Sequence, residues 1–174
     1  MDILVQSAKH NLHQLKDFLN LLSTDEFIKP LPILSDSTIG MHTRHIIEFY
    51  QCIVNGMLQG NINYDERERN TLTETNLNFA IQSIENCLQD FNLFQEDKKI
   101  NLHLNLFKNQ KTAIQTTIKR ELLYVIEHSI HHMAILKMAC KENFLHIGFP
   151  NDFGVAFSTI NFRNSVHSNV SASS

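Results

Sequence analysis

Residues 118–142 read IKRELLYVIEHSIHHMAILKMACKE, and this stretch decides the class of fold. Its core-facing residues recur at intervals of three and four, as they do in an amphipathic helix that packs against other helices. The stripe consists of Leu122, Ile126, Ser129, Met133, Leu136 and Cys140. The pattern therefore predicts a helix from about residue 118 to residue 142.

Three earlier segments show the same helical periodicity. Residues 2–23 place leucines on one face of a predicted helix. Pro30 and Pro32 interrupt the helix, and a second helix is predicted at residues 38–58. A third helix is expected to begin near Thr73 and to extend to Phe91. The polar run NINYDERERN (61–70) separates the second helix from the third.

Residues 98–117 differ from the rest of the chain. INLHLNLF (100–107) alternates apolar and polar residues, KNQK (108–111) resembles a turn, and TAIQTT (112–117) is rich in threonine and isoleucine. This pattern predicts a short β-hairpin, with an irregular connection as the alternative.

Together these segments predict an all-α fold, namely a four-helix bundle with long connections and a short hairpin before its last helix. One domain is expected over residues 1–174, with the bundle at 2–142, a packed tail at 143–165 and a frayed end at 166–174. The tail is too aromatic for a free linker.

Composition excludes several classes of protein. The 174 residues carry a net charge of −3, so no basic excess exists for binding nucleic acid or an anionic membrane surface. The sequence has neither an apolar run of about 20 residues nor a signal peptide. Its three cysteines form no CxxC pair and are expected to be reduced. We therefore expect a cytoplasmic protein.

The ten histidines are the chemically informative residues, and two groups of them lie within predicted helices. GMHTRHIIEF (40–49) and VIEHSIHHMA (125–134) together contain His42, His45, Glu48, Glu127, His128, His131 and His132. His128 and His132 are four residues apart, which places them one above the other on a helix. A third imidazole from the helix at 38–58 would complete a set of three nitrogen ligands and leave a position for water or substrate.

Helical-wheel geometry separates these candidates. On the helix at 118–142, His128 and His132 lie on the flank of the apolar stripe, whereas Glu127 and His131 point away from it. On the helix at 38–58, the same geometry slightly favours His42 over His45 as the more buried residue.

The sequence lacks the motifs of several other kinds of catalytic or cofactor site. The chain has no HExxH, no G-x-S-x-G and no CxxCH, and it has too few core carboxylates for a di-iron bundle.

The two histidine segments resemble the DinB/YfiT-like family of metalloenzymes, over residues ~1–142. Thr38, Gly40, His45 and Ile46 match that family's (S/T)-x-G-x-x-x-x-H-(I/L) stretch, and His128 and His132 match its H-x-x-x-H stretch. The resemblance implies a four-helix bundle with a three-histidine site for a divalent metal, frequent dimerisation and, in some relatives, transfer of low-molecular-weight thiols.

The sequence also departs from the family pattern. His42 replaces the usual apolar residue, and Met133, Ala134 and Ile135 stand where relatives often carry Gly-Gln. The resemblance assigns His45 as the ligand, which agrees with a position at the edge of the stripe, and leaves His42 as a pocket residue behind the ligands.

We therefore expect a metal-dependent enzyme with an open site at His45, His128 and His132. The ion would be zinc or nickel, with iron, manganese or copper as alternatives. It would activate a thiol for transfer or a water for hydrolysis, with His42, Glu48, Glu127 or His131 as candidates for moving protons. The alternative is a non-catalytic metal- or ligand-binding stress-response protein, in which a fourth ligand such as His42 closes the site. The expected partners are a small-molecule substrate and a second copy of the chain.

Overall fold

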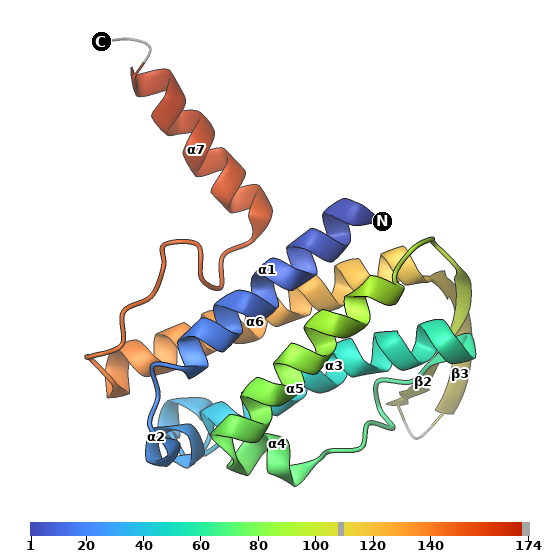
Figure 1. Ribbon diagram of the computed structural model, residues 1–174, viewed down its shortest axis with the longest axis horizontal. Helices are drawn as coiled ribbons and strands as arrows, with labels where there is room; N and C mark the ends of the chain where they lie inside the picture. Colours follow the sequence, from blue (N-terminus) through green and yellow to red (C-terminus); the bar gives the residue numbers. More distant parts are fainter. Residues whose placement is uncertain (108–109, 172–174) are drawn as a thin grey trace.

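The computed structural model describes residues 1–107 and 110–171, the last six of these by their backbone alone. The fold is mostly helical and includes a small three-stranded sheet (Figure 1). The helices are α1 (Asp2–Leu19), α2 (Thr24–Ile28), α3 (Ile39–Gln59), α4 (Thr71–Thr75), α5 (Leu77–Asp90), α6 (Ile118–Asn143) and α7 (Phe157–Ser171). The strands are β1 (Asn61–Ile62), β2 (Lys99–Leu106) and β3 (Gln110–Thr117).

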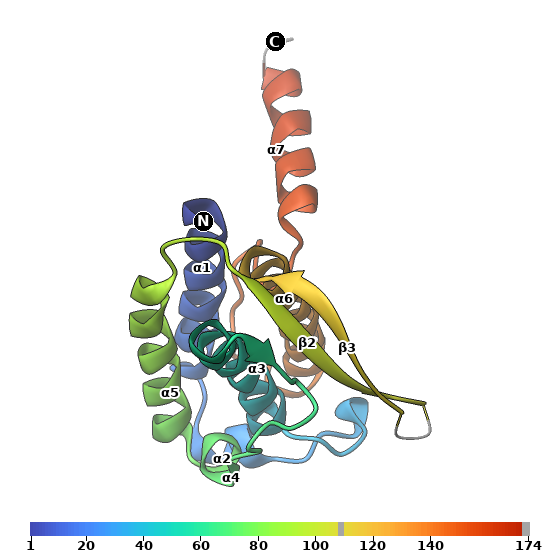
Figure 2. The same cartoon turned by 90° about the vertical axis from the view of Figure 1, so that its right-hand side faces the viewer.

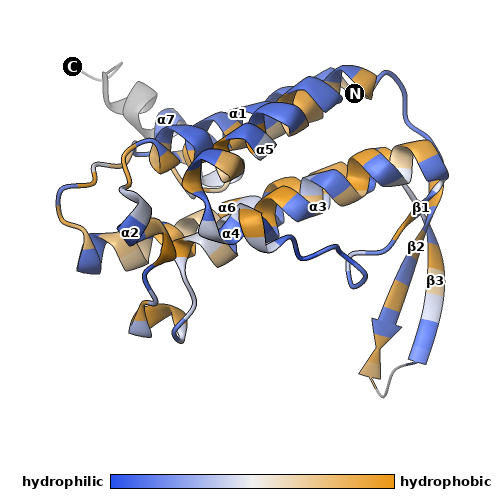
Figure 3. Ribbon diagram, turned by 60° about the horizontal axis from the view of Figure 1, so that its bottom comes forward, coloured by the Kyte–Doolittle hydropathy of each residue, from blue (hydrophilic) through white to orange (hydrophobic). Residues whose placement is uncertain are grey.

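Four of the helices surround one hydrophobic core. Helix α3 contacts both α5 and α6, and α1 contacts the same two helices. The core includes Leu12, Leu15, Ile46, Ile53 and Leu122, each almost completely buried. Figure 3 shows orange and blue residues alternating around α1, α3 and α5, as expected for amphipathic helices that bury one face.

The start of α3 explains why its sequence carries Thr38 and Gly40. The Thr38 hydroxyl accepts a hydrogen bond from the Met41 N–H at 3.0 Å and so caps the helix. Gly40 lies against α4, where an added Cβ would come within 2.0 Å of the Glu74 carbonyl oxygen. This close approach holds α4 against α3 and fixes the histidine-bearing turn that follows.

The predicted hairpin is confirmed, but the all-α expectation is only partly correct. Strands β2 and β3 pair antiparallel from Lys99↔Thr117 to Leu106↔Gln110. Strand β1 pairs parallel with β2 and lies within the polar run that was expected only to end the preceding helix. The reason is tertiary, because the buried Ile62 side chain packs directly against Gly56 of α3.

Two helix boundaries differ from the sequence-based prediction. The first helix ends at Leu19, because Ser23 and Glu26 form a reciprocal capping box that begins α2. The third is divided into α4 and α5 at Asn76, whose side chain accepts a hydrogen bond from the Phe79 N–H at 3.0 Å. Side-chain caps therefore start new helices where periodicity alone predicted continuation.

The tail packs on the body only in its first part. Phe153 is buried against Phe18 of α1, with ring centroids 5.5 Å apart. Helix α7 then points away from the other helices (Figures 1 and 2). It extends through Ser171. Fraying at 166–174 stays a prediction, and residues 172–174 lie outside the described residues.

Within residues 1–107 and 110–171, no helix has the length and apolar character needed to cross a membrane.

We expect Gly40→Ala to lower the free energy of unfolding by about 2 kcal/mol, because a methyl group has no room against a backbone oxygen. Urea denaturation followed by circular dichroism measures the change. Gly148→Ala is the matched control, since an added Cβ there meets nothing within 4 Å. Equal stability of the two variants would show that α4 does not need this close contact.

Candidate metal centre

Helices α3 and α6 bring three histidines together. The Nε2 atoms of His45 and His128 lie 2.8 Å apart, and one ring nitrogen from each of His45, His128 and His132 lies within 4.8 Å of the other two. Two imidazole nitrogens bound to one zinc ion at ~2.0–2.1 Å would be separated by roughly 3 Å. The three histidines are therefore close enough to hold a metal ion.

A fourth histidine contacts this group from the preceding turn of α3. The Nδ1 atom of His42 lies 3.0 Å from the Nδ1 atom of His132. That contact occupies one nitrogen of His132 and leaves its Nε2 atom for an ion. A histidine that binds an ion through Nε2 keeps its proton on Nδ1, and His42 is placed to accept that hydrogen bond.

Partial burial keeps these rings uncharged. Desolvation and, to a smaller extent, the nearby Arg67 guanidinium lower the pKa of His45 to about 3. Desolvation and the neighbouring histidines together lower the pKa of His132 to about 3. The pKa values of His42 and His128 are lowered mainly for the same reason. Neutral imidazoles offer free lone pairs at pH 7, so the donor set fits a transition-metal ion.

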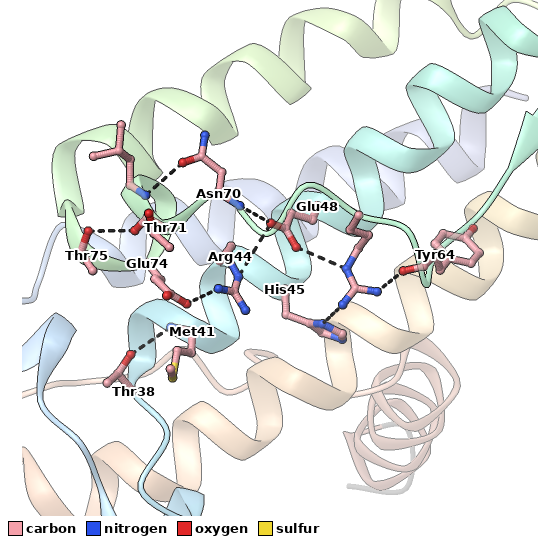
Figure 4. Close-up of polar contacts among 12 residues, drawn as sticks. Thr38, Met41, Arg44, His45, Glu48, Tyr64, Asn70, Thr71, Glu74 and Thr75 are labelled. Carbon is pink, nitrogen blue, oxygen red and sulfur yellow. Dashed lines mark hydrogen bonds and ion pairs between the residues drawn. The ribbon is translucent and has the colours of Figure 1, made fainter. Parts of the chain in front are cut away.

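Alternating charges lead from α4 to the histidines. Figure 4 shows this series from Glu74 through Arg44 to the buried Glu48. Glu48 accepts from the Asn70 N–H at 2.9 Å and pairs with the Arg67 Nε at 3.3 Å. Both carboxylate oxygens of Glu48 are thus occupied, and one of them holds Arg67 in place.

Arg67 reaches the remote side of one candidate ligand. Its Nη2 atom lies 3.5 Å from the Nδ1 atom of His45, and its Nη1 atom donates to the Tyr64 carbonyl oxygen. A guanidinium has donors only, so in this arrangement the Nδ1 atom of His45 carries the lone pair and Nε2 carries the proton. Ion binding at Nε2 must displace that proton and break the Arg67 contact.

Two aromatic rings pack against His128. The Phe49 ring stacks on His128 with centroids 4.5 Å apart, and Tyr124 lies on the same imidazole at 5.6 Å. Tyr64 stacks on Phe49, and its hydroxyl donates to the buried Glu121 carboxylate at 3.0 Å. The rings thereby restrict the orientation of His128.

The remaining candidates lie farther from the site. Glu127 and His131 are exposed, as the wheel predicted, although the His131 ring still contacts the His132 ring with centroids 5.6 Å apart. Cys52, Cys87 and Cys140 are free thiols.

Arg67 and Tyr64 were not predicted from the sequence. Both belong to the run 61–70, which has no periodicity to place its side chains. A tyrosine and an arginine within a linker of mostly acidic and amide residues are a weak signal at best.

Comparison with known proteins finds limited similarity. One curated protein, FK506-binding protein 5 of Rhizopus delemar, is 33% identical over 107 residues. The match covers 57% of this chain and 26% of that protein, so this chain spans about a quarter of its length. No family model matches the chain, and no solved structure matches it.

The lowered histidine pKa values predict acid sensitivity of the metal-free protein. The folded pKa values of His45 and His132, about 3, lie below the ordinary value of 6.5, so the unfolded state binds more protons between these limits. The contribution of these two rings to the free energy of unfolding is therefore fully present above pH 6.5, and it decreases as the pH falls toward 3. We expect a loss of roughly 1 kcal/mol per pH unit for each ring, allowing for partial exposure.

Urea titrations at pH 7, 5.5 and 4.5 in the presence of a chelator measure this loss. The double variant His45→Gln/His132→Gln should show a flatter dependence than the exposed control His13→Gln. Identical slopes in both variants would contradict the assignment of the pH dependence to the buried rings.

Removal of Arg67 should strengthen metal binding. The guanidinium repels a cation and competes for the Nδ1 atom of His45, so we expect Arg67→Met to bind Zn²⁺ about threefold to tenfold more tightly. Competition with a chromophoric chelator measures the affinity, and Arg69→Met, which changes an exposed arginine in the same segment, is the control. Weaker binding by Arg67→Met would indicate that Arg67 supports the ligand geometry instead.

Proposed function

We propose that this protein is a DinB/YfiT-like metal-dependent enzyme whose ion is held by His45, His128 and His132. The observation that carries the proposal is the 2.8 Å separation of the His45 and His128 Nε2 atoms, with His132 in the same group. The packing of α1, α3, α5 and α6 around one core supports a four-helix bundle of that family's type.

The donor set indicates zinc or nickel, with iron, manganese or copper as alternatives, because neutral imidazoles suit these ions better than Mg²⁺ or Ca²⁺. A divalent ion at three imidazoles lowers the pKa of a bound water or thiol and so supplies a nucleophile near neutral pH. We propose thiol transfer to an electrophile as the reaction, with hydrolysis as the alternative.

The surrounding residues prepare the ligands. With an ion on Nε2 of His132, the proton of that ring would be on Nδ1, and His42, 3.0 Å away, would accept it. Phe49 and Tyr124 keep the His128 ring in place by stacking. Arg67 is held by Glu48 and contacts His45. Its positive charge therefore weakens the binding of a cation by His45.

A closed structural site is the competing proposal. His42 contacts the Nδ1 side of the His132 ring, so it would act as a fourth ligand only after moving to the side that faces the ion. An ion with four protein ligands would have no position for substrate. The protein would then be a non-catalytic metal-binding protein.

The setting of the activity is part of the same proposal. The three free cysteines support a reducing compartment, for which we propose the cytoplasm. We also propose a low-molecular-weight thiol as a substrate and a homodimer as the working form.

Metal stoichiometry of single variants tests the proposal. We expect His45→Ala, His128→Ala and His132→Ala each to lose the ion, because two imidazoles hold it too weakly to survive purification. His42→Ala should retain the ion with reduced affinity, and His131→Ala, on the exposed face of α6, should retain it fully. Elemental analysis of the purified proteins gives the metal content, and circular dichroism confirms that each variant folds.

Each contrary result has a specific meaning. Loss of metal from His42→Ala together with the other three would favour the closed site and remove most support for an enzyme. A folded His131→Ala variant without metal would show that the face assignment on α6 is wrong.

A further inference from the structure

A second candidate site lies beside the histidines and does not include them. An open cavity of about 720 Å³ lies between the C-terminal half of α3, the segment 61–68 and the β2–β3 arm. Glu48 and Arg67 form its wall on the side of the metal centre. The volume lies within the range of about 300–1,000 Å³ that is typical of ligand-binding sites.

A row of carboxamides follows α3 along this cavity. Gln51, Asn55 and Gln59 all line it, at intervals of four residues on one face of the helix. Four residues of helix rise about 6 Å, and two residues of an extended chain span about 6.6 Å. The row therefore matches the repeat with which an extended peptide presents a backbone N–H and C=O to one side.

These carboxamides are exposed and make no hydrogen bond to another described residue. Within residues 1–107 and 110–171, the side chains of Gln51, Asn55 and Gln59 make no hydrogen bond, whereas Asn61 and Asn63 across the cavity accept hydrogen bonds from neighbouring groups. Each free carboxamide offers both a donor and an acceptor, which is the complement of a peptide group.

The neighbouring strand edge is not available for the same purpose. Beyond β1, the Asn105 N–H of β2 already donates to the Asp65 carboxylate at 2.9 Å. A peptide in the cavity would therefore pair with the side chains of α3 and would not add a strand to β2.

The charges of the lining indicate which peptides fit. Glu48 is paired with Arg67, and Glu66 lies 3.8 Å from Lys111. Glu68 also lines the cavity and forms no ion pair with any described residue. An uncompensated carboxylate favours a basic side chain on the ligand.

We propose that this cavity binds an extended peptide segment with a basic residue, held through its backbone by Gln51, Asn55 and Gln59. The binding does not require the metal ion. It is therefore independent of the proposed enzyme activity.

Nuclear magnetic resonance of the full chain tests this proposal with a defined probe. The probe is an acetylated and amidated heptapeptide of alanine and serine with a central lysine, added up to about 10 mM, where millimolar binding becomes visible. We expect saturable shifts of the side-chain NH₂ signals of Gln51, Asn55 and Gln59, unchanged by a chelator.

Matched variants and probes distinguish recognition of the peptide backbone from nonspecific binding. The triple variant Gln51→Met/Asn55→Leu/Gln59→Met keeps side-chain size and should bind at least about tenfold more weakly, because it loses several amide hydrogen bonds. Gln82→Met, which changes an exposed carboxamide on α5, should bind normally. Two peptides N-methylated at alternate positions should differ, because only one of them removes the N–H groups that face α3.

Three results would overturn the proposal. They are the absence of saturable shifts at the highest peptide concentration, equal binding by the triple variant, and saturation of the same amides by maltotriose but not by the peptide. The last result would assign the cavity to a saccharide.

Discussion

The packing of α3 against α6 places four partly desolvated imidazoles between two helices, and the rest of the site depends on this contact. The ring nitrogens meet in two pairs, His45 with His128 at 2.8 Å and His42 with His132 at 3.0 Å. Desolvation disfavours the charged form of each ring, so the pairs are stable only as neutral hydrogen-bonded partners or as ligands of a cation. Partial burial thus leaves these residues neutral and able to act as metal ligands, and we expect it to make the metal-free fold sensitive to acid.

A second constraint comes from the buried charges beside the histidines. Glu48 is almost completely buried, with Arg44 and Arg67 on either side of it, and removing one partner would leave an uncompensated charge in a poorly solvated place. This series connects the close contact of α4 at Gly40 with the remote nitrogen of His45. Helix α4 is thus connected to the candidate metal centre through a series of ion pairs.

The segment 61–70 has a larger role than that of a connection. It supplies β1, which anchors the hairpin, Tyr64, which stacks on Phe49, and Arg67, which contacts His45. It also forms one wall of the polar cavity along α3. The candidate metal centre and the cavity thus share one structural element, and changes in this segment are expected to affect both.

The sequence by itself determined the long helices, the hairpin and the two histidine clusters. Repeats of three or four residues and strict alternation are local patterns, so the bounds of α3 and α6 were predicted to within one residue. The spacing of His128 and His132 and the resemblance at Thr38, Gly40 and His45 predicted that these three histidines lie together, and they do. Only the tertiary structure decided the position of His42 against His132, the parallel strand β1, the division at Asn76, and the places of Arg67 and Tyr64. Most of these features depend on contacts between residues that are distant in the chain. The division at Asn76 depends on a side-chain cap that competes with continuation of the helix. Neither kind of interaction produces a periodic pattern in the sequence.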